Sequence, residues 1–407
     1  MHKIETLLQT LAPNGVEFRK LGEMLEYDQP NQYCVTSKEF DKSYPIPVLT
    51  AGKTFILGYT NEKDNIYQAS KNAPVIIFDD FTTATQWVDF PFKVKSSAMK
   101  ILLPKNPTIN IRFIFFYMQT IPYNISGEHT RQWISRYSQL EVPIPPLEIQ
   151  QEIVKILDAF TELNTELNTE LKARKKQYQY YQNMLLDFND INQNHKDAKM
   201  STKPYPKRLK TLLQTLAPKG VEFRKLGEVI NILKGKQLNK ELLLNYGEYP
   251  VMNGGIYASG YWNEYNTDCP KIIISQGGAS AGYVNYMTSK FWAGAHCYTI
   301  ELNSEKLNYK FLYYFLKNSQ TILMKSQFGA GIPALNKADI ETLTIPIPPL
   351  EIQQEIVKIL DQFSLLTTDL LAGIPAEIKA RKKQYEYYRE KLLTFKPLTP
   401  NKEVKKC

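Results

Sequence analysis

Several features that would place a protein in a familiar class are missing from this sequence. Its four cysteines (Cys34, Cys269, Cys297 and Cys407) are dispersed and form no CxxC pair, which excludes a zinc-finger framework and a disulfide scaffold. The four histidines are equally scattered, so no metal site is predicted. The longest apolar runs, such as 113–118, are far too short to cross a bilayer. Because residues 1–13 also lack an apolar signal core, these absences predict a cytoplasmic protein with no membrane partner.

Common catalytic and nucleotide-binding motifs are absent too. The sequence has no GxGxxG or P-loop pattern. Both Pro-Pro dipeptides precede leucine, so the Asn/Asp-Pro-Pro-Tyr/Phe motif of amino-methyltransferases is missing.

Two weaker candidates for catalysis remain. Asp79 and Asp80 follow a strand-like run, as in some metal nucleases, but no acidic-x-Lys element comes after them. Ser280 lies in a GxSxG pattern, but a strand-like segment follows it where a nucleophile elbow requires a helix. A single-chain nuclease or hydrolase using Asp79/Asp80 or Ser280 is therefore the alternative hypothesis, and we predict no catalytic residue.

Charge is modest and unevenly distributed. The net charge of +9 is consistent with a polyanionic partner. Residues 1–205 carry 23 basic and 23 acidic groups, whereas residues 206–407 carry 27 and 18. The 407 residues suffice for two or three domains, and 43% apolar with 22% charged residues is typical of a globular protein.

The most informative feature is an internal repeat. TLLQTLAPNGVEFRKLGE at 6–23 returns almost unchanged at 211–228, and VPIPPLEIQQEIVKILDAF at 142–160 returns at 345–363. We call these repeated segments the frame and the segments between them the inserts. The first insert shows no counterpart in the second: 27–55 does not resemble 231–255. Near-identical frames with different inserts indicate a shared partner for the frames and a separate target for each insert.

After each PIPPLEIQ motif the pattern becomes helical. Apolar residues recur at alternating four- and three-residue steps, which is typical of a coiled-coil seam. Two related helices in one chain can bury their seams against each other, and a twofold relation between the repeats requires them to run antiparallel. The second helix is expected to break at Gly373 and Pro375. The seam residues are Ile149, Ile153, Ile156, Phe160, Leu163 and Leu167, then Ile352, Ile356, Ile359, Phe363, Leu366 and Leu370.

The inserts have the pattern of α/β (α+β) domains. Strand-like runs occur at 73–78, 100–103 and 271–274. Each insert then has one convincing helix, at 110–120 and 308–324, with Asn110 and Asn308 as expected N-caps.

Glycine, amide and basic residues gather in the inserts. DNA recognition needs cations for phosphates and Gln, Asn, Arg or Lys side chains for base edges. An ordinary surface loop is the competing interpretation of any single residue, but the set together favours DNA contact. The candidates are Lys53, Thr54, His129, Arg131, Gln132 and Arg136 in the first insert, and Lys234, Lys236, Gln237, Asn253, Gln276, Ser280 and His296 in the second.

A basic segment, ARKKQY, is repeated at 173–178 and 380–385. It could be a DNA patch or a helix face presented to a protein. Because it returns beside inserts that differ, we favour the protein-partner interpretation, carried by Arg174, Lys175, Tyr178, Arg381, Lys382 and Tyr385.

The chain alternates two inserts with two nearly identical frames. Each insert ends at the motif PIPPLEIQQEIVKILD, and a helix with ARKKQY follows. This arrangement closely resembles the specificity subunit of type I restriction-modification enzymes. The resemblance covers essentially the whole chain. It implies two target-recognition domains that each bind half of a split site in double-stranded DNA, joined by two helices packed as an antiparallel coiled coil with a pseudo-twofold repeat. It also implies docking of two adenine-methyltransferase subunits and, through them, restriction subunits. The subunit itself then binds no cofactor, and S-adenosylmethionine, ATP and Mg belong to its partners.

On this interpretation the chain divides into six segments. Recognition domain 1 is 1–146 and recognition domain 2 is 206–348. The remaining segments are a central helical spacer at 147–188, a linker at 189–205, a distal spacer at 349–395 and a tail at 396–407.

The central spacer contains three tandem tetrads, TELN, TELN and TELK, at 161–172. They resemble the short spacer repeats whose number sets the gap between half-sites in some family members. Four helical residues add ~6 Å and a net rotation of ~40°, close to the ~35° twist of one base pair. A tetrad is therefore predicted to change the gap by about one base pair.

Overall fold

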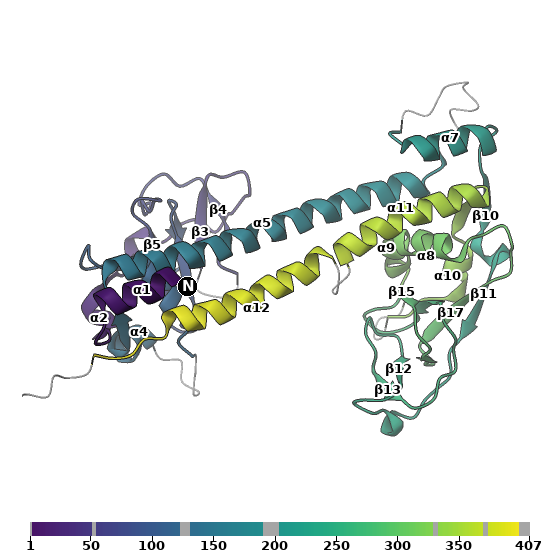
Figure 1. Ribbon diagram of the computed structural model, residues 1–407. Helices are drawn as coiled ribbons and strands as arrows, with labels where there is room; N and C mark the ends of the chain where they lie inside the picture. Colours follow the sequence, from purple (N-terminus) through teal and green to yellow (C-terminus); the bar gives the residue numbers. More distant parts are fainter. Residues whose placement is uncertain are drawn as a thin grey trace, which may run out of the picture. The chain divides into compact units, whose positions relative to one another are not determined.

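The structure, a computed structural model, describes residues 2–50, 54–122, 131–189, 203–328, 333–368 and 373–398, which form two compact units (Figure 1). Unit 1 combines Met1–Leu167 with Ile378–Cys407, and unit 2 is Asn168–Glu377. Both divisions fall inside helices, so each unit contains one insert and part of both helical spacers. No helix within the described ranges is long and apolar enough to cross a membrane.

The insert of unit 1 is built on two small sheets. The four-stranded sheet has the order β2-β8-β5-β6, and the three-stranded sheet has the order β4-β3-β7, in which β3 and β7 are parallel. Every residue of β5 is buried, which explains the continuous apolar run that predicted this strand. The elements are β2 (Leu25–Asp28), η1 (Pro30–Tyr33), β3 (Ile46–Leu49), β4 (Ile56–Thr60), β5 (Val75–Asp79), β6 (Thr85–Val88), β7 (Lys93–Val94), β8 (Met99–Pro104), α3 (Ile111–Met118), α4 (Gln132–Ser135) and η2 (Tyr137–Gln139).

The insert of unit 2 repeats this topology. Its sheets have the orders β11-β17-β14-β15 and β13-β12-β16, again with the short last strand parallel to the middle one. The two inserts therefore share one fold, although their sequences show no correspondence over the first third. The elements are β11 (Ile230–Lys234), η4 (Lys240–Leu242), β12 (Tyr249–Met252), β13 (Gly260–Trp262), β14 (Lys271–Ser275), β15 (Val284–Met287), β16 (Trp292–Ala293), β17 (Cys297–Leu302), α8 (Tyr309–Asn318), α9 (Gln320–Lys325) and α10 (Lys337–Glu341).

The frame closes each insert with a two-stranded antiparallel sheet. Strand β1 (Glu17–Lys20) pairs with β9 (Glu141–Ile144), and β10 (Glu222–Lys225) pairs with β18 (Thr344–Ile347) in the same register. Since β1 precedes the insert and β9 follows it, this pairing brings both ends of the insert together. A short turn follows each first strand, α2 (Leu21–Met24) in unit 1 and η3 (Leu226–Glu228) in unit 2.

The helical spacers follow directly. The first is one helix of 40 residues, α5 (Leu147–Leu186), and the second is divided into α11 (Leu350–Thr368) and α12 (Ile374–Leu393). The predicted break is confirmed, because Pro375 lies in the first turn of α12. Backbone N–H groups in the first turn have no partner within the helix, so a proline there costs no hydrogen bond. The expected Asn110 and Asn308 caps are also confirmed, since each side chain accepts two N–H groups of its helix.

Each unit contains one packed pair of spacer segments. In unit 1, Phe160 of α5 packs on Tyr385 and Tyr388 of α12, with ring centroids 6.3 and 5.5 Å apart. The two segments are antiparallel, because the chain leaving α12 reaches Val16, beside the sheet from which α5 starts. Unit 2 has the equivalent contacts: Phe363 of α11 packs on Tyr178 and Tyr181 of α5, at 6.4 and 5.1 Å. Pairing along the full length of the spacers stays a prediction.

The apolar face of each spacer is wider than the predicted seam. In α5, Ile149, Ile153 and Leu157 are fully buried in the core of unit 1, whereas Ile156 and Phe160 are half-buried. In α11, Ile352, Ile356 and Leu360 take the same positions in unit 2. One edge of each spacer helix is therefore part of the hydrophobic core of its unit, and the other edge contacts the second spacer.

A buried glutamine of the PIPPLEIQ motif connects insert to spacer in both units. Gln150 accepts the backbone N–H of Asn110 (2.9 Å) and donates to the Pro145 carbonyl (2.7 Å). Gln353 accepts the N–H of Asn308 (2.7 Å) and donates to two carbonyls, at 2.6 and 2.8 Å. Both side chains are at most 1% exposed, so the glutamine fixes the N-terminus of α3 or α8 to the spacer.

An ion pair reinforces each of these junctions. Arg112 of α3 lies 2.7 Å from Asp158, and Lys310 of α8 lies 2.7 Å from Asp361. The buried glutamine and the ion pair therefore attach both inserts to their spacers in the same way, although the insert sequences differ.

Substitution of Gln353 by Ala is expected to lower the free energy of unfolding by about 2–4 kcal/mol, because one buried N–H and two carbonyls lose their partner. Urea unfolding of the full chain measures this change. The neighbouring Gln354 is exposed, so Gln354→Ala is the matched control and should change the free energy by less than about 0.5 kcal/mol. Equal effects of the two substitutions would contradict the proposed contact.

Candidate nucleic-acid interface

Loops that are distant in sequence converge on one surface of unit 2. The backbone N–H of His296 donates to the Asn253 side chain (3.2 Å), and that of Gln276 donates to the His296 carbonyl (2.9 Å). Gly254 has φ +84, and a Cβ there would lie 3.1–3.2 Å from His296 and the Gly277 carbonyl, so only glycine suits this close approach. The structure thus brings together three of the predicted DNA-contacting residues.

The other candidates of unit 2 lie beside this group. The N–H of Lys236 donates to the Ala293 carbonyl (2.8 Å), which places 234–237 next to the turn that leads to His296. Lys236 and Gln237 are exposed. Ser280 is in the turn after β14, where its carbonyl accepts the N–H of Tyr283 (2.9 Å).

The candidates of unit 1 are less uniformly exposed. Thr54, Arg131 and Arg136 are exposed. Gln132, in contrast, is buried and only 4% exposed, because the first turn of α4 lies against Asp80, whose carbonyl accepts the Gln132 N–H (2.8 Å); its predicted DNA contact lacks the exposure that such a contact needs. Lys53 and His129 lie outside the described residues.

Equivalent positions of the two inserts show how the candidate residues of unit 1 correspond to those of unit 2. Asp80 directly follows β5 and Gln276 directly follows β14. The Asp80 carbonyl accepts an N–H from the start of α4, and the Gln276 carbonyl accepts the N–H of Leu335, just before α10. The start of α4, with the candidates Arg131 and Gln132, therefore lies against the loop of the first insert that is equivalent to the Gln276 loop of the second.

The geometry excludes the alternative sites as catalytic centres. Asp79 and Asp80 are 6% and 2% exposed; Asp79 accepts N–H groups of its own turn, and Asp80 accepts the N–H of Trp133 (2.8 Å). Lys100 lies 3.7 Å from Asp80, and burial lowers the pKa of Lys100 against the opposing effect of that carboxylate. Strand β15, not a helix, follows Ser280. Both motifs serve local structure.

No group of three or more His, Cys, Asp or Glu side chains in the described part of the chain could hold a metal ion. Cys34, Cys269 and Cys297 are free thiols, and burial raises the pKa of Cys297 to about 12, which makes it unreactive.

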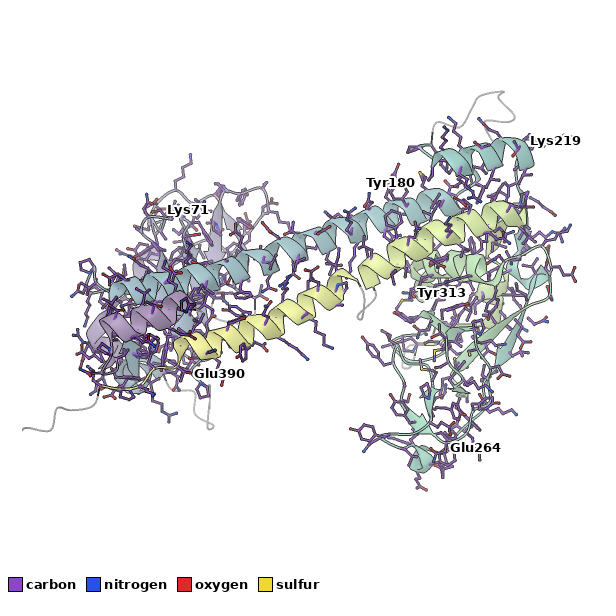
Figure 2. The ribbon with its side chains drawn as sticks, viewed as in Figure 1. Lys71, Tyr180, Lys219, Glu264, Tyr313 and Glu390 are labelled. Carbon is purple, nitrogen blue, oxygen red and sulfur yellow. The ribbon has the colours of Figure 1, made fainter. Side chains whose placement is uncertain are left out.

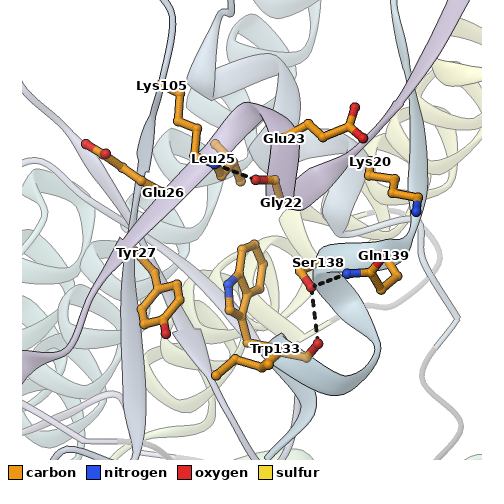
Figure 3. A pocket seen from close by; sticks show the side chains of 11 residues that line it. Lys20, Gly22, Glu23, Leu25, Glu26, Tyr27, Lys105, Trp133, Ser138 and Gln139 are labelled. Carbon is orange, nitrogen blue, oxygen red and sulfur yellow. Dashed lines mark hydrogen bonds between the residues drawn. The ribbon is translucent and has the colours of Figure 1, made fainter.

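A cavity of about 610 Å³ lies where frame and insert meet in unit 1 (Figure 3). Its lining combines frame residues Lys20 and Glu23 with insert residues Tyr27, Lys105 and Trp133. Lys105 donates to the carbonyl of Gly22 (2.6 Å), where a Cβ would come within 3.0 Å of Ser138. The repeated glycine therefore allows the insert to pack closely on the frame.

The repeated basic segments do not present all the residues that the sequence suggested. Tyr178 and Tyr385 pack inside the helix pairs described above, which fits their role as seam residues and not as exposed partner contacts. Lys175 and Lys382 are exposed, whereas Arg174 and Arg381 are half-exposed and bond to Gln177 and Gln384 of the same helix.

Two other tyrosines are exposed at equivalent positions of the repeat. Tyr180 is 54% exposed on α5 and Tyr387 is 59% exposed on α12 (Figure 2 labels Tyr180). Sequence reasoning missed them, although their place in the YY pair after ARKKQY gave a signal.

The chain has two domains of one fold, each attached to a helical frame, and their polar loops differ. Both suspected catalytic motifs serve local structure. These features are typical of a recognition protein. The family model for the type I restriction modification DNA specificity domain matches residues 13–177 and 218–380. The chain is 38% identical to the EcoR124I/EcoR124II specificity subunit of Escherichia coli, over 98% of this chain and 99% of that one. It is 31% identical to a putative specificity subunit of Haemophilus influenzae over 70% of this chain and 73% of the relative.

Solved structures agree in fold. The S subunit of the M. genitalium type I restriction-modification system matches with a TM-score of 0.62 at 19% identity, over 93% of this chain and 96% of that one. A chain from a structure concerned with assembly of a type I R-M system matches with a TM-score of 0.52 at 17% identity, over 94% and 98%. The chain belongs to the type I restriction-modification specificity subunits, the non-catalytic DNA-recognition components of these systems.

Proposed function

We propose that this chain recognises a split DNA sequence, with the loops of each recognition domain contacting one half-site, and that its two frames each dock one methyltransferase subunit. The observation that carries the proposal is the contrast between nearly identical frames and divergent loops on one shared fold. Shared attachment through Gln150 and Gln353 fixes both domains to their spacers in the same way, so differences in target must come from the loops.

The DNA-contacting surface of domain 2 is the group around Asn253, Gln276 and His296, flanked by Lys234, Lys236 and Gln237. In domain 1 we assign this role to Thr54, which follows β3 as Asn253 follows β12, and to Arg131 and Arg136, which flank α4. Amide, imidazole and guanidinium groups suit base edges, and the lysines suit phosphates. Domain 2 carries 16 basic and 10 acidic groups, six of the nine excess charges, so it is expected to contribute more of the salt-dependent affinity.

Selection of bound duplexes from a random library tests this function. The full chain in complex with its methyltransferase subunits should enrich two fixed sequences separated by a fixed gap. Enrichment of no sequence over random DNA would contradict the proposal.

The frame supports the partner part of the proposal. Lys175 and Tyr180 in the first repeat, and Lys382 and Tyr387 in the second, are exposed at equivalent positions of the spacer helices. Two equivalent surfaces fit two copies of one partner. Restriction subunits then join through the methyltransferases, and S-adenosylmethionine, ATP and Mg are bound by these partners in the cytoplasm.

Tyr180→Ala and Tyr387→Ala are each expected to weaken one of the two methyltransferase contacts by about tenfold, because an exposed aromatic ring is a typical anchor of an interface. Light scattering of the purified complex near the dissociation constant should then show one methyltransferase per chain for each single variant and none for the double variant. Tyr246 is 89% exposed but lies in an insert, so Tyr246→Ala is the control and should retain two. Two bound copies on the double variant would exclude these surfaces as the docking sites.

A further inference from the structure

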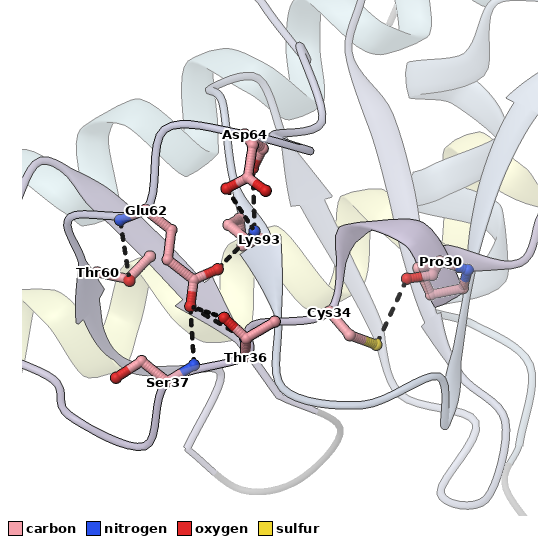
Figure 4. Close-up of polar contacts among 8 residues, drawn as sticks. All are labelled: Pro30, Cys34, Thr36, Ser37, Thr60, Glu62, Asp64 and Lys93. Atoms are coloured by element: carbon pink, nitrogen blue, oxygen red, sulfur yellow. Dashed lines mark hydrogen bonds and ion pairs between the residues drawn. The ribbon is translucent and has the colours of Figure 1, made fainter.

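A polar cluster around the buried Lys93 in domain 1 joins three segments that are far apart in sequence (Figure 4). The Glu62 carboxylate accepts the backbone N–H of Thr36 (3.0 Å), the Thr36 hydroxyl (3.0 Å) and the N–H of Ser37 (2.9 Å). Its other oxygen lies 2.7 Å from the Lys93 ammonium, which also donates to the Asp64 carbonyl (3.0 Å). We call Glu62, Lys93, Thr36 and Ser37 the Glu62 cluster.

The charged pair of the cluster is largely shielded from solvent, although Thr36 is exposed. The side chain of Lys93 is 1% exposed and that of Glu62 is 13% exposed. Burial alone would raise the pKa of Glu62, but Lys93 and the N–H and O–H donors of Thr36 and Ser37 outweigh it and lower the pKa to about 2. The carboxylate is therefore ionised at neutral pH, the state that accepts from these donors.

The cluster fixes a loop that corresponds to a candidate DNA-contacting loop of domain 2. Val35 donates its N–H to the Val94 carbonyl of β7 (2.9 Å), and Lys236 donates to the Ala293 carbonyl of β16 (2.8 Å). Val94 and Ala293 are the second residues of equivalent strands, so Thr36 occupies the place of Gln237.

The anchor itself differs between the domains. Lys93 pairs with Val48, and Trp292 pairs with Val251, so both stand at the same point of the fold. Trp292 donates its indole N–H to the Lys236 carbonyl (3.1 Å) and thus holds its loop directly. In domain 1, Lys93 holds the loop through Glu62. The first residue of the short parallel strand therefore anchors the loop in both domains, through an ion pair in domain 1 and through an indole hydrogen bond in domain 2.

We propose that Glu62 is the positioning residue for recognition of the first half-site: paired with Lys93, it sets the backbone of Thr36 and Ser37, and the loop they begin contacts the bases of that half-site. This rests on the proposed function of the domains. No sequence pattern indicated it, because the four residues are separated by up to 57 positions and none belongs to a repeat. A contacting loop needs such support, since misplacement by about an ångström is enough to lose specific contacts.

The test uses a double variant that removes both charges, Glu62→Gln with Lys93→Met, so that no lone charge is left buried. In complex with its methyltransferase subunits, this variant should lose at least tenfold of its preference for the first half-site over random sequence and keep its preference for the second. Thr36→Val removes only the hydroxyl donor and should give a smaller loss, again at the first half-site alone. The readout is duplex selection scored separately for each half-site, with thermal unfolding measured on the same samples.

A matched variant in domain 2 completes the design. Trp292→Phe removes the indole donor and should reduce preference for the second half-site only. Unchanged preference of the double variant at the first half-site would overturn the proposal, as would an equal loss at both half-sites accompanied by a lower melting temperature. If the wild-type chain showed no preference at either half-site, the proposed function itself would have failed.

Discussion

Deletion of one tetrad, residues 165–168, is expected to change the gap between the two half-sites by about one base pair and to leave both half-sites unchanged. The tetrads lie within α5, which is helical without interruption from Leu147 to Leu186. Removing four residues shortens this helix by ~6 Å and rotates its two ends by a net ~40°. Phe160 and Tyr178 lie on either side of the deletion, so each unit keeps its aromatic contacts.

The effect on affinity should be large, because two linked sites bind together only when the spacing allows it. Affinity for the original gap should fall by on the order of 100-fold, with recovery at a neighbouring gap. Binding to a series of duplexes whose gap varies by single base pairs measures this shift. Thr165→Ala with Asn168→Ala keeps the length and is the control, which should retain the original gap. A change of bases in either half-site would contradict the separation of spacing from recognition.

Replacement of residues 24–140 by residues 229–343 is expected to give a protein that recognises two copies of the second half-site. The cuts fall just before β2 and β9 and at the equivalent points of domain 2, between frame and insert. The graft should fold, because it brings its own attachment groups: Asn308 can donate to Gln150 as Asn110 does, and Lys310 can reach Asp158 as Arg112 does.

Affinity for the original first half-site should then fall by at least about 100-fold, which is within the range that separates specific from non-specific DNA binding. Methylation mapping in cells that carry the graft measures both half-sites at once. The reciprocal graft is the control and should yield two copies of the first half-site. Loss of the second half-site, which the first graft does not touch, would show that the domains do not act independently.

Local sequence features predicted much of this fold. Continuous apolar runs identified β5 and β14, because strands covered on both faces need no alternation. Asn110 and Asn308 identified the starts of α3 and α8, and Pro375 identified the break before α12. Each of these signals acts within a few residues of the chain.

The shared fold of the two inserts was not predictable in the same way. Strands β2 and β11 need only suitable side chains on their buried faces, and many sequences supply them. Domain 1 also inserts η1 between β2 and the Val35 anchor, where domain 2 has one residue, Gly235. Such a difference removes any alignment of 27–55 with 231–255.

Side-chain exposure was also decided by packing. Gln132 had the right chemistry for a DNA contact, but the contact of α4 with Asp80 buries it. Tyr178 and Tyr385 belong to the repeated basic segment, yet their rings face Phe363 and Phe160, and Tyr180 and Tyr387 are exposed in their place.

The sequence by itself determined the duplication, the frames, the spacer helices and the absence of common catalytic motifs, because identity of segments and local chain chemistry need no knowledge of distant contacts. Only the tertiary structure decided which loop residues share a surface. Asn253, Gln276 and His296 meet through strand pairing, and Thr36 meets Glu62 and Lys93 only once β4 and β7 have joined one sheet. Contacts of this kind depend on register between strands, which no single segment of the chain encodes.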